Sequence, residues 1–111
     1  MRNVLLIVDP QNDFITGTLP VEGAEEKMKN LADYIEKKGH LYDCICITLD
    51  SHPEDHCSFK ENGGIWPKHC VIETDGWGIP EYLGTALLYT PAPISSFRKG
   101  TKTDSEEYSI F

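Results

Sequence analysis

The order of apolar segments at the start of the chain restricts the possible folds more than any other feature. Residues 3–8 contain an unbroken apolar run from Val4 to Val8, which indicates a strand buried on both faces, as in a parallel sheet. Residues 24–38 carry apolar side chains at helical spacing, and Gly39 follows where such a helix should end. Residues 44–49 are again β-rich and apolar. A strand, a helix and a second strand in this order predict a right-handed βαβ unit.

The second half of the chain has weaker patterns. Residues 51–80 are rich in Pro, Gly and His and have no sustained period, so we expect a long irregular segment that is ordered by Phe59, Trp66 and Trp77. Residues 82–89 fit either a short helix or a strand, and residues 94–98 fit a third strand. A chain of 111 residues has room for one hydrophobic core.

Charge and cysteine content exclude several classes of protein. The 10 Lys and Arg residues against 18 Asp and Glu residues give a formal net charge of -8, which argues against nucleic acid or an anionic membrane as a partner. The first apolar run is too short for a signal sequence or a membrane span, so we expect a cytoplasmic protein. Four cysteines without a signal sequence argue against a disulfide framework, and Cys44 and Cys46 fit buried strand positions.

Charged residues follow each of the three expected strands. Asp9, Asp50 and Lys99 stand at these strand ends, and in parallel α/β sheets the ligand crevice lies outside the carboxyl ends of the strands. Any one of them alone would more often be a turn or solvated residue. Together they are expected to face one crevice.

A candidate metal site overlaps this group. Asp50 and His52 are separated by one residue at a strand end, and the long irregular segment supplies His69. One carboxylate and two imidazoles form the ligand set that divalent metals such as zinc favour when a position is left open to solvent. Three of the four histidines fall within residues 52–69. This clustering favours metal ligation over a separate structural role for each histidine.

Four motifs follow one another along the chain. They are Asp9-Pro10-Gln11-Asn12-Asp13-Phe14, Asp50-Ser51-His52 with His56-Cys57-Ser58-Phe59, Trp66-Pro67-Lys68-His69-Cys70-Val71, and Arg98-Lys99-Gly100-Thr101 with Tyr108-Ser109-Ile110-Phe111. In this order they resemble the nicotinamidase/pyrazinamidase branch of the isochorismatase-like hydrolases. The resemblance implies an α/β fold with a Rossmann-like parallel sheet and flanking helices. It also implies hydrolysis of nicotinamide to nicotinic acid and ammonia, as in NAD salvage.

The resemblance implies a role for each matching residue. Asp9 matches the acid that takes the proton of a cysteine thiol and returns it to the leaving ammonia, and Lys99 matches the lysine that favours the thiolate. Asp50, His52 and His69 match the ligands of one divalent metal ion, with zinc expected first and manganese or iron as alternatives. The substrate-binding residues that match are Phe14, Trp66 and Tyr108, which suit a planar pyridine carboxamide.

The sequence departs from the family at the nucleophile. In the family this cysteine lies well downstream of the Lys-Gly motif, whereas this chain ends at Phe111. Cys57 and Cys70 lie inside other motifs, at positions that the family does not use as nucleophile. Residues 1–111 are therefore expected to be the N-terminal part of a single isochorismatase-like domain, with an incomplete sheet and no activity alone. Its apolar edge strand is expected to associate with a second copy or with a complementary C-terminal segment.

Two other functions remain open at this point. A non-catalytic, metal-binding interaction module would keep the pocket and lack the nucleophile. A related amidase of the same superfamily would act on a carbamoyl or ureido substrate. The set of Asp50, His52 and His69 favours the nicotinamidase branch, because isochorismatase-type members lack it.

Overall fold

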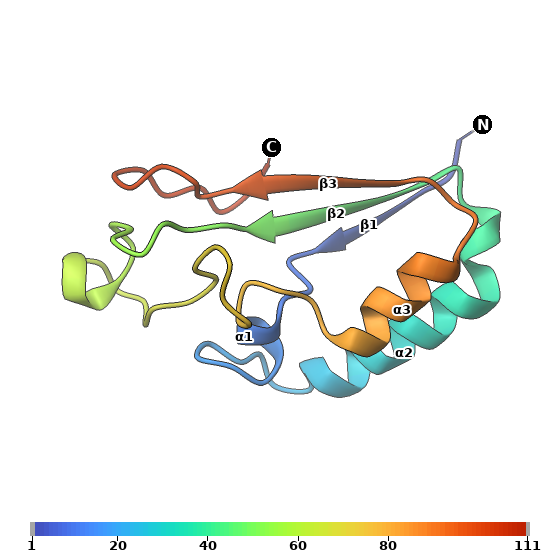
Figure 1. The fold of residues 1–111 in the computed structure, drawn as a ribbon, viewed down its shortest axis with the longest axis horizontal. Helices are drawn as coiled ribbons and strands as arrows, with labels where there is room; N and C mark the ends of the chain where they lie inside the picture. Colours follow the sequence, from blue (N-terminus) through green and yellow to red (C-terminus); the bar gives the residue numbers. More distant parts are fainter. Residues whose placement is uncertain (1, 111) are drawn as a thin grey trace.

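A three-stranded parallel sheet with two long helices against one face forms the framework of the chain, as seen in the computed structural model, which describes residues 2–110 (Figure 1). At least one helix separates each strand from the next along the sequence. The elements are β1 (Val4–Val8), α1 (Asn12–Ile15), α2 (Ala24–Lys38), β2 (Cys44–Asp50), α3 (Glu81–Tyr89) and β3 (Ile94–Lys99), with short 3-10 segments at Gly39–Leu41 and Lys60–Asn62. The three strands and α2 agree with the sequence patterns to within a residue or so at each end.

The register of the sheet brings the three strand ends together. Strand β2 is central and pairs in parallel with β1 on one side and β3 on the other. Val8 of β1 lies opposite Thr48, and Asp50 lies opposite Lys99. The residue after β1, Asp9, therefore emerges at the same edge as the last residues of β2 and β3.

The hydrophobic core lies between the sheet and the helices α2 and α3, which pack side by side (Figure 1). Residues 82–89, which the sequence left ambiguous, belong to the helix α3. Leu83, Ala86 and Leu87 show why, because the spacing i, i+3, i+4 buries all three against the sheet and α2. Within residues 2–110, no helix is both long enough and apolar enough to span a lipid bilayer.

The expectation that the first strand is buried on both faces is wrong. Ile7 is buried and Leu5 packs against the core, whereas Val4, Leu6 and Val8 on the opposite face are exposed. In the part of the chain that the structure describes, helices cover one face of the sheet only, and β1 is an edge strand (Figure 1). An uncovered apolar strand of this kind favours association with another surface, and that association stays a prediction.

The irregular segment between β2 and α3 is folded back onto the strand ends. Two isolated bridges within the segment, His52 with Val71 and Phe59 with Trp66, give it internal order, and the backbone N–H groups of α1 donate to its carbonyls at Gly76 and Gly78. Phe59 is fully buried, as expected for an aromatic residue that orders the segment. All four cysteines are free.

Candidate metal and active site

Lys99 and Asp9 form a buried ion pair at the carboxyl ends of the strands. The Lys99 Nζ atom lies 2.8 Å from Asp9 Oδ2 and 3.6 Å from Asp50 Oδ1, and the lysine side chain is only 6% exposed. Burial lowers the pKa of Lys99, but the hydrogen bond to Asp9 and the charge of Asp50 outweigh it, so the pKa is raised overall. Lys99 is therefore a permanent positive charge beside two carboxylates.

The backbone and hydroxyl of β2 fix Asp9 in an uncommon conformation. Its φ is 48°, in the left-handed region that non-glycine residues rarely adopt. Its N–H donates to the Thr48 carbonyl at 3.0 Å, and the Thr48 hydroxyl donates to Asp9 Oδ1 at 2.8 Å. Strained positions of this type occur where the surrounding structure holds a functional side chain in place. One Asp9 oxygen is thus held by Thr48 and the other faces Lys99.

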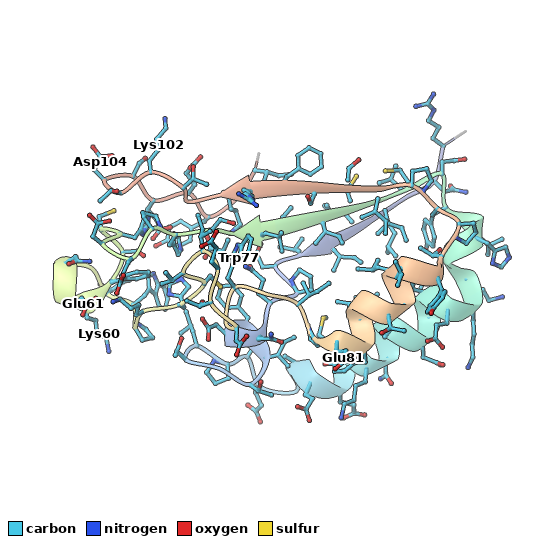
Figure 2. All side chains as sticks on the ribbon, viewed as in Figure 1. Lys60, Glu61, Trp77, Glu81, Lys102 and Asp104 are labelled. Atoms are coloured by element: carbon cyan, nitrogen blue, oxygen red, sulfur yellow. The ribbon has the colours of Figure 1, made fainter. Side chains whose placement is uncertain are left out.

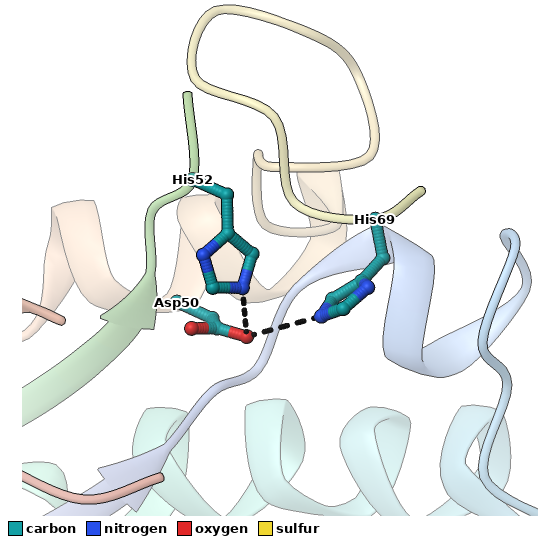
Figure 3. Close-up of side chains that lie close together, drawn as sticks. All are labelled: Asp50, His52 and His69. Carbon is teal, nitrogen blue, oxygen red and sulfur yellow. Dashed lines mark hydrogen bonds and ion pairs between the residues drawn. The ribbon is translucent and has the colours of Figure 1, made fainter. Parts of the chain in front are cut away.

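Asp50, His52 and His69 converge into one buried cluster (Figure 3). Asp50 Oδ2 lies 3.0 Å from His52 Nε2 and 3.4 Å from His69 Nε2. The potential ligand atoms all lie within 4.8 Å of one another. The sequence expectation that the long segment returns His69 to the end of β2 agrees with this geometry.

Carbonyl groups behind the two histidines fix their orientation. His52 Nδ1 lies 2.8 Å from the Gly100 carbonyl oxygen, and His69 Nδ1 lies 2.7 Å from that of Pro67. Each Nδ1 must carry a proton to donate there, which leaves the Nε2 lone pair of a neutral ring directed at the Asp50 carboxylate. Two lone pairs facing a carboxylate require a cation or additional protons between them. This arrangement, a backbone carbonyl behind each imidazole, is typical of metal-ligating histidines.

The charges of the cluster also suit a divalent cation. Burial raises the pKa of Asp50, but hydrogen bonds from His52 and His69 and the charges of His52 and Lys99 together bring it well below its usual range. For His69 burial lowers the pKa, and hydrogen bonds to Asp50 and to the Pro67 carbonyl raise it overall. Asp50 Oδ1 is buried without a hydrogen-bond partner among the described residues, an acceptor that a cation would satisfy. The three side chains therefore fit a metal ion with nitrogen and oxygen ligands.

Two residues that sequence reasoning quoted without a role hold this cluster in place. The Gln11 side chain donates to the Asp50 carbonyl at 2.7 Å and accepts the Asp50 N–H at 2.8 Å, so it brackets the backbone of a candidate ligand. The Asp13 carboxylate accepts the N–H of Cys70, next to His69, at 2.8 Å. A Cβ atom on Gly76 would overlap this carboxylate. Both side chains lie in the Asp-Pro-Gln-Asn-Asp motif, and this motif was the feature of the sequence from which their importance could have been predicted.

A second layer of side chains packs around His52. The ring of His56 stacks on it with centroids 4.0 Å apart, and Phe59 meets it edge-on at 5.5 Å. His56 is itself fixed, because its Nδ1 lies 2.7 Å from Ser58 Oγ and its Nε2 lies 3.0 Å from the Ser105 carbonyl oxygen. Sequence reasoning assigned His56 no role, although its motif was noted. His52 is thus confined on both sides.

A cavity of about 210 Å³ opens at the strand ends, and of the three candidate ligands Asp50 and His69 line it, whereas His52 is buried outside its lining. Its lining brings together most of the candidate residues, namely Asp9, Phe14, Leu19, Asp50, Trp66, His69, Lys99, Glu106, Glu107 and Tyr108. The Trp66 indole N–H donates to the Tyr108 hydroxyl at 3.4 Å, which links the two aromatic walls. Glu106 and Glu107 were not anticipated, because no pattern in the sequence ties the end of the chain to this cavity.

None of the four cysteines, all within the described residues, lines this cavity. Cys70 follows His69 but is fully buried. Burial, followed by the charges of Asp50, Asp13 and Asp9, raises its pKa far above the usual value. A thiol held protonated in this way is a poor nucleophile.

Comparisons with known proteins agree with the resemblance seen in the sequence motifs. No protein-family model matches the sequence. The nicotinamidase of Saccharomyces cerevisiae is 30% identical over 133 residues, which cover 96% of this chain and 61% of that protein. The crystal structure of the pyrazinamidase of Pyrococcus horikoshii in complex with zinc has a TM-score of 0.79 and 34% identity, covering 97% of this chain and 57% of that one. The chain fits an N-terminal portion of the nicotinamidase family.

A second solved structure has a similar fold. PnC1 from L. infantum in complex with nicotinate has a TM-score of 0.83 and 33% identity, and the match covers 99% of this chain and 53% of that one. The expected α/β fold, with a parallel sheet and flanking helices, is confirmed by these structures. The chain spans 54% to 61% of the length of the curated nicotinamidases it matches.

Proposed function

We propose that this chain supplies the metal ligands, the acid, the lysine and the aromatic walls of a nicotinamidase-type amidohydrolase site, acting on a pyridine carboxamide. The observation that carries the proposal is one cavity lined by the Asp9–Lys99 ion pair together with Asp50 and His69, with the third candidate ligand, His52, buried beside Asp50. The structure of PnC1 from L. infantum contains nicotinate, and that of the P. horikoshii enzyme contains zinc. Zinc is accordingly the metal we expect first, with manganese or iron as alternatives.

In this proposal each side chain has its own chemical role. Asp9 is the group placed to accept a proton from a thiol and to return it to the leaving ammonia, because its second oxygen faces the cavity beside Lys99. Lys99 pairs with Asp9 and adds positive charge that favours a nearby thiolate. Phe14, Trp66 and Tyr108 offer flat apolar walls for a heteroaromatic ring. When bound, a divalent ion supplies Lewis acidity at the same cavity.

In our proposal, none of the four cysteines of this chain acts as the nucleophile. The thiol would then come from a separate polypeptide segment. The position of the cysteines equally favours a second candidate function, a metal-binding module that binds a pyridine ligand without hydrolysing it. Both candidates predict metal-dependent pyridine binding, and they differ in whether a docked thiol starts the reaction.

Ammonia release from nicotinamide separates the two candidates. We expect the zinc-loaded chain to bind nicotinate, to lose that binding when zinc is removed by a chelator, and to release ammonia no faster than its Cys70→Ala variant. Adding a separately expressed C-terminal segment of a nicotinamidase, with its cysteine, should start ammonia release, and the same segment with that cysteine changed to alanine is the control. Metal-dependent nicotinate binding without ammonia release after the segment is added would favour the metal-binding module. Full activity of the chain alone that Cys70→Ala abolishes would contradict our assignment of the nucleophile.

Metal affinity should fall as the pH is lowered. The raised pKa of His69 means that its Nε2 lone pair is taken by a proton at a higher pH than in an ordinary histidine, whereas Asp50 stays ionised because its pKa is depressed. Below the pKa of His69, each unit of pH should weaken zinc binding about tenfold for one displaced proton. Calorimetric titrations between about pH 5.5 and 8 measure this slope. A flat profile would show that His69 is not a ligand.

A further inference from the structure

A second cavity lies on the helix-covered face of the sheet, between the strands β2 and β3 and the helix α3. Its volume is about 320 Å³, within the usual range for small-molecule sites, and it shares no lining residue with the metal cavity. Its walls are almost entirely apolar, formed by Ile47, Leu49, Trp77, Ile79, Leu87 and Ile94. The hydroxyl of Ser96 and the small residues Gly78 and Gly84 complete the lining.

The aromatic wall of this second cavity is rigidly held. The Trp77 indole N–H donates to Ser51 Oγ at 2.9 Å, and the Trp77 carbonyl accepts a hydrogen bond from Gln11 Nε2 at 2.9 Å. Trp77 lies on the helix side of the sheet (Figure 2). One hydrogen bond fixes the ring and the other fixes the backbone of the same residue, so Trp77 offers a preformed surface that a ligand need not order on binding.

One unpaired positive charge stands at the rim. Arg98 lies opposite Leu49 in the sheet register, so its side chain leaves on the face that carries the cavity. Its guanidinium carbon is 5.1 Å from the centroid of the Trp77 ring. No carboxylate within residues 2–110 forms an ion pair with it, in contrast to the neighbouring Lys99. The metal cavity makes no use of Arg98.

We propose that this cavity binds a small, flat, apolar molecule that carries a single carboxylate. The apolar body would lie against Trp77 and the aliphatic walls, and the carboxylate would accept hydrogen bonds from the Arg98 guanidinium. One guanidinium balances one negative charge, and the net charge of -8 disfavours ligands with several charges, such as phosphates. A pyridine ring would leave its nitrogen unpaired among aliphatic side chains, so the ligand class differs from that of the metal cavity.

Cinnamate and its uncharged counterpart, cinnamyl alcohol, test the proposal by calorimetry on the full chain. We expect cinnamate to bind about fivefold more tightly than the alcohol, the size of effect typical of an exposed ion pair. Arg98→Gln should remove this preference and leave binding of the alcohol unchanged. Gly84→Leu should weaken both ligands at least tenfold, because its side chain enters the cavity. A Cβ at position 84 meets only Ile79 Cδ1, at 3.8 Å, and leucine favours the helix, so the variant should fold.

The NMR signals of the two tryptophans show directly which of the two cavities binds cinnamate. In nitrogen-15 NMR spectra, cinnamate should shift the indole N–H signal of Trp77 and not that of Trp66, the two being assigned with a Trp66→Phe variant. Phe14→Ala, which alters the metal cavity, should leave cinnamate binding unchanged. The proposal is overturned if cinnamate does not bind at millimolar concentration, if Gly84→Leu has no effect, or if nicotinate competes with it.

Discussion

Replacing His52 by alanine should weaken zinc binding by about 100-fold or more. The substitution removes one of three candidate ligands, and loss even of residues behind a metal ligand commonly costs 10-fold to 100-fold in affinity. The neighbouring ring of His56 is held by Ser58 Oγ at 2.7 Å and the Ser105 carbonyl oxygen at 3.0 Å, so we do not expect it to take the place of His52. Calorimetric titration of zinc into the two proteins measures the difference.

His40→Ala is the matched control for this experiment. His40 is the one histidine of the four that lies before β2; it is exposed and is not part of the cluster. We expect its substitution to leave zinc affinity unchanged, which would exclude a general effect of histidine number. Circular dichroism of the metal-free proteins should show that both variants fold. Equal affinity of wild type and a folded His52→Ala variant would contradict the metal-site assignment.

Gly100→Ala should disrupt the metal site more than it destabilises the fold. Gly100 has a φ of +67°, and an added Cβ would lie 2.5 Å from His52 Cε1 and 3.0 Å from Asp50 Oδ1. The left-handed backbone alone costs about 1–2 kcal/mol for alanine. The steric contact must in addition move His52 away from Asp50, which breaks the arrangement of Nε2 atoms around the carboxylate. We expect zinc affinity to fall by more than tenfold.

Gly23→Ala separates backbone strain from steric contact. Gly23 has a similar φ of +78°, but a Cβ there meets nothing within 4 Å. This variant should lose a comparable amount of free energy of unfolding, measured by urea denaturation of the metal-free chain, and should keep its zinc affinity. If Gly100→Ala also keeps wild-type zinc affinity, the close approach of Gly100 to His52 does not shape the site.

Local patterns were sufficient for the elements that carry the fold. The run from Val4 to Val8 and the helical spacing of residues 24–38 depend on neighbouring residues, so the sequence predicted β1 and α2 closely. The exposure of Leu6 could not be predicted in this way. It depends on which face of the sheet the helices cover, and this is a property of the packed chain.

The candidate ligands could be predicted because their chemistry is visible in the residue types. The residues that position these ligands could not be predicted, because each of them acts through a contact between distant parts of the sequence. Gln11 meets Asp50 across 39 residues, Asp13 meets Cys70 across 57, and Gly100 meets His52 across 48. Glutamine, aspartate and glycine are ordinary turn residues until the fold shows what they contact.

The most direct test of the central claim is an anomalous-diffraction map from crystals of the chain soaked in zinc, recorded at the zinc absorption edge. The account predicts one strong peak about 2.0–2.2 Å from an Asp50 carboxylate oxygen and from the Nε2 atoms of His52 and His69. That peak should lie on the wall of the cavity that contains Asp9 and Lys99. A map with zinc bound elsewhere, for instance at Cys44 and Cys46, and no peak among the three side chains would contradict it.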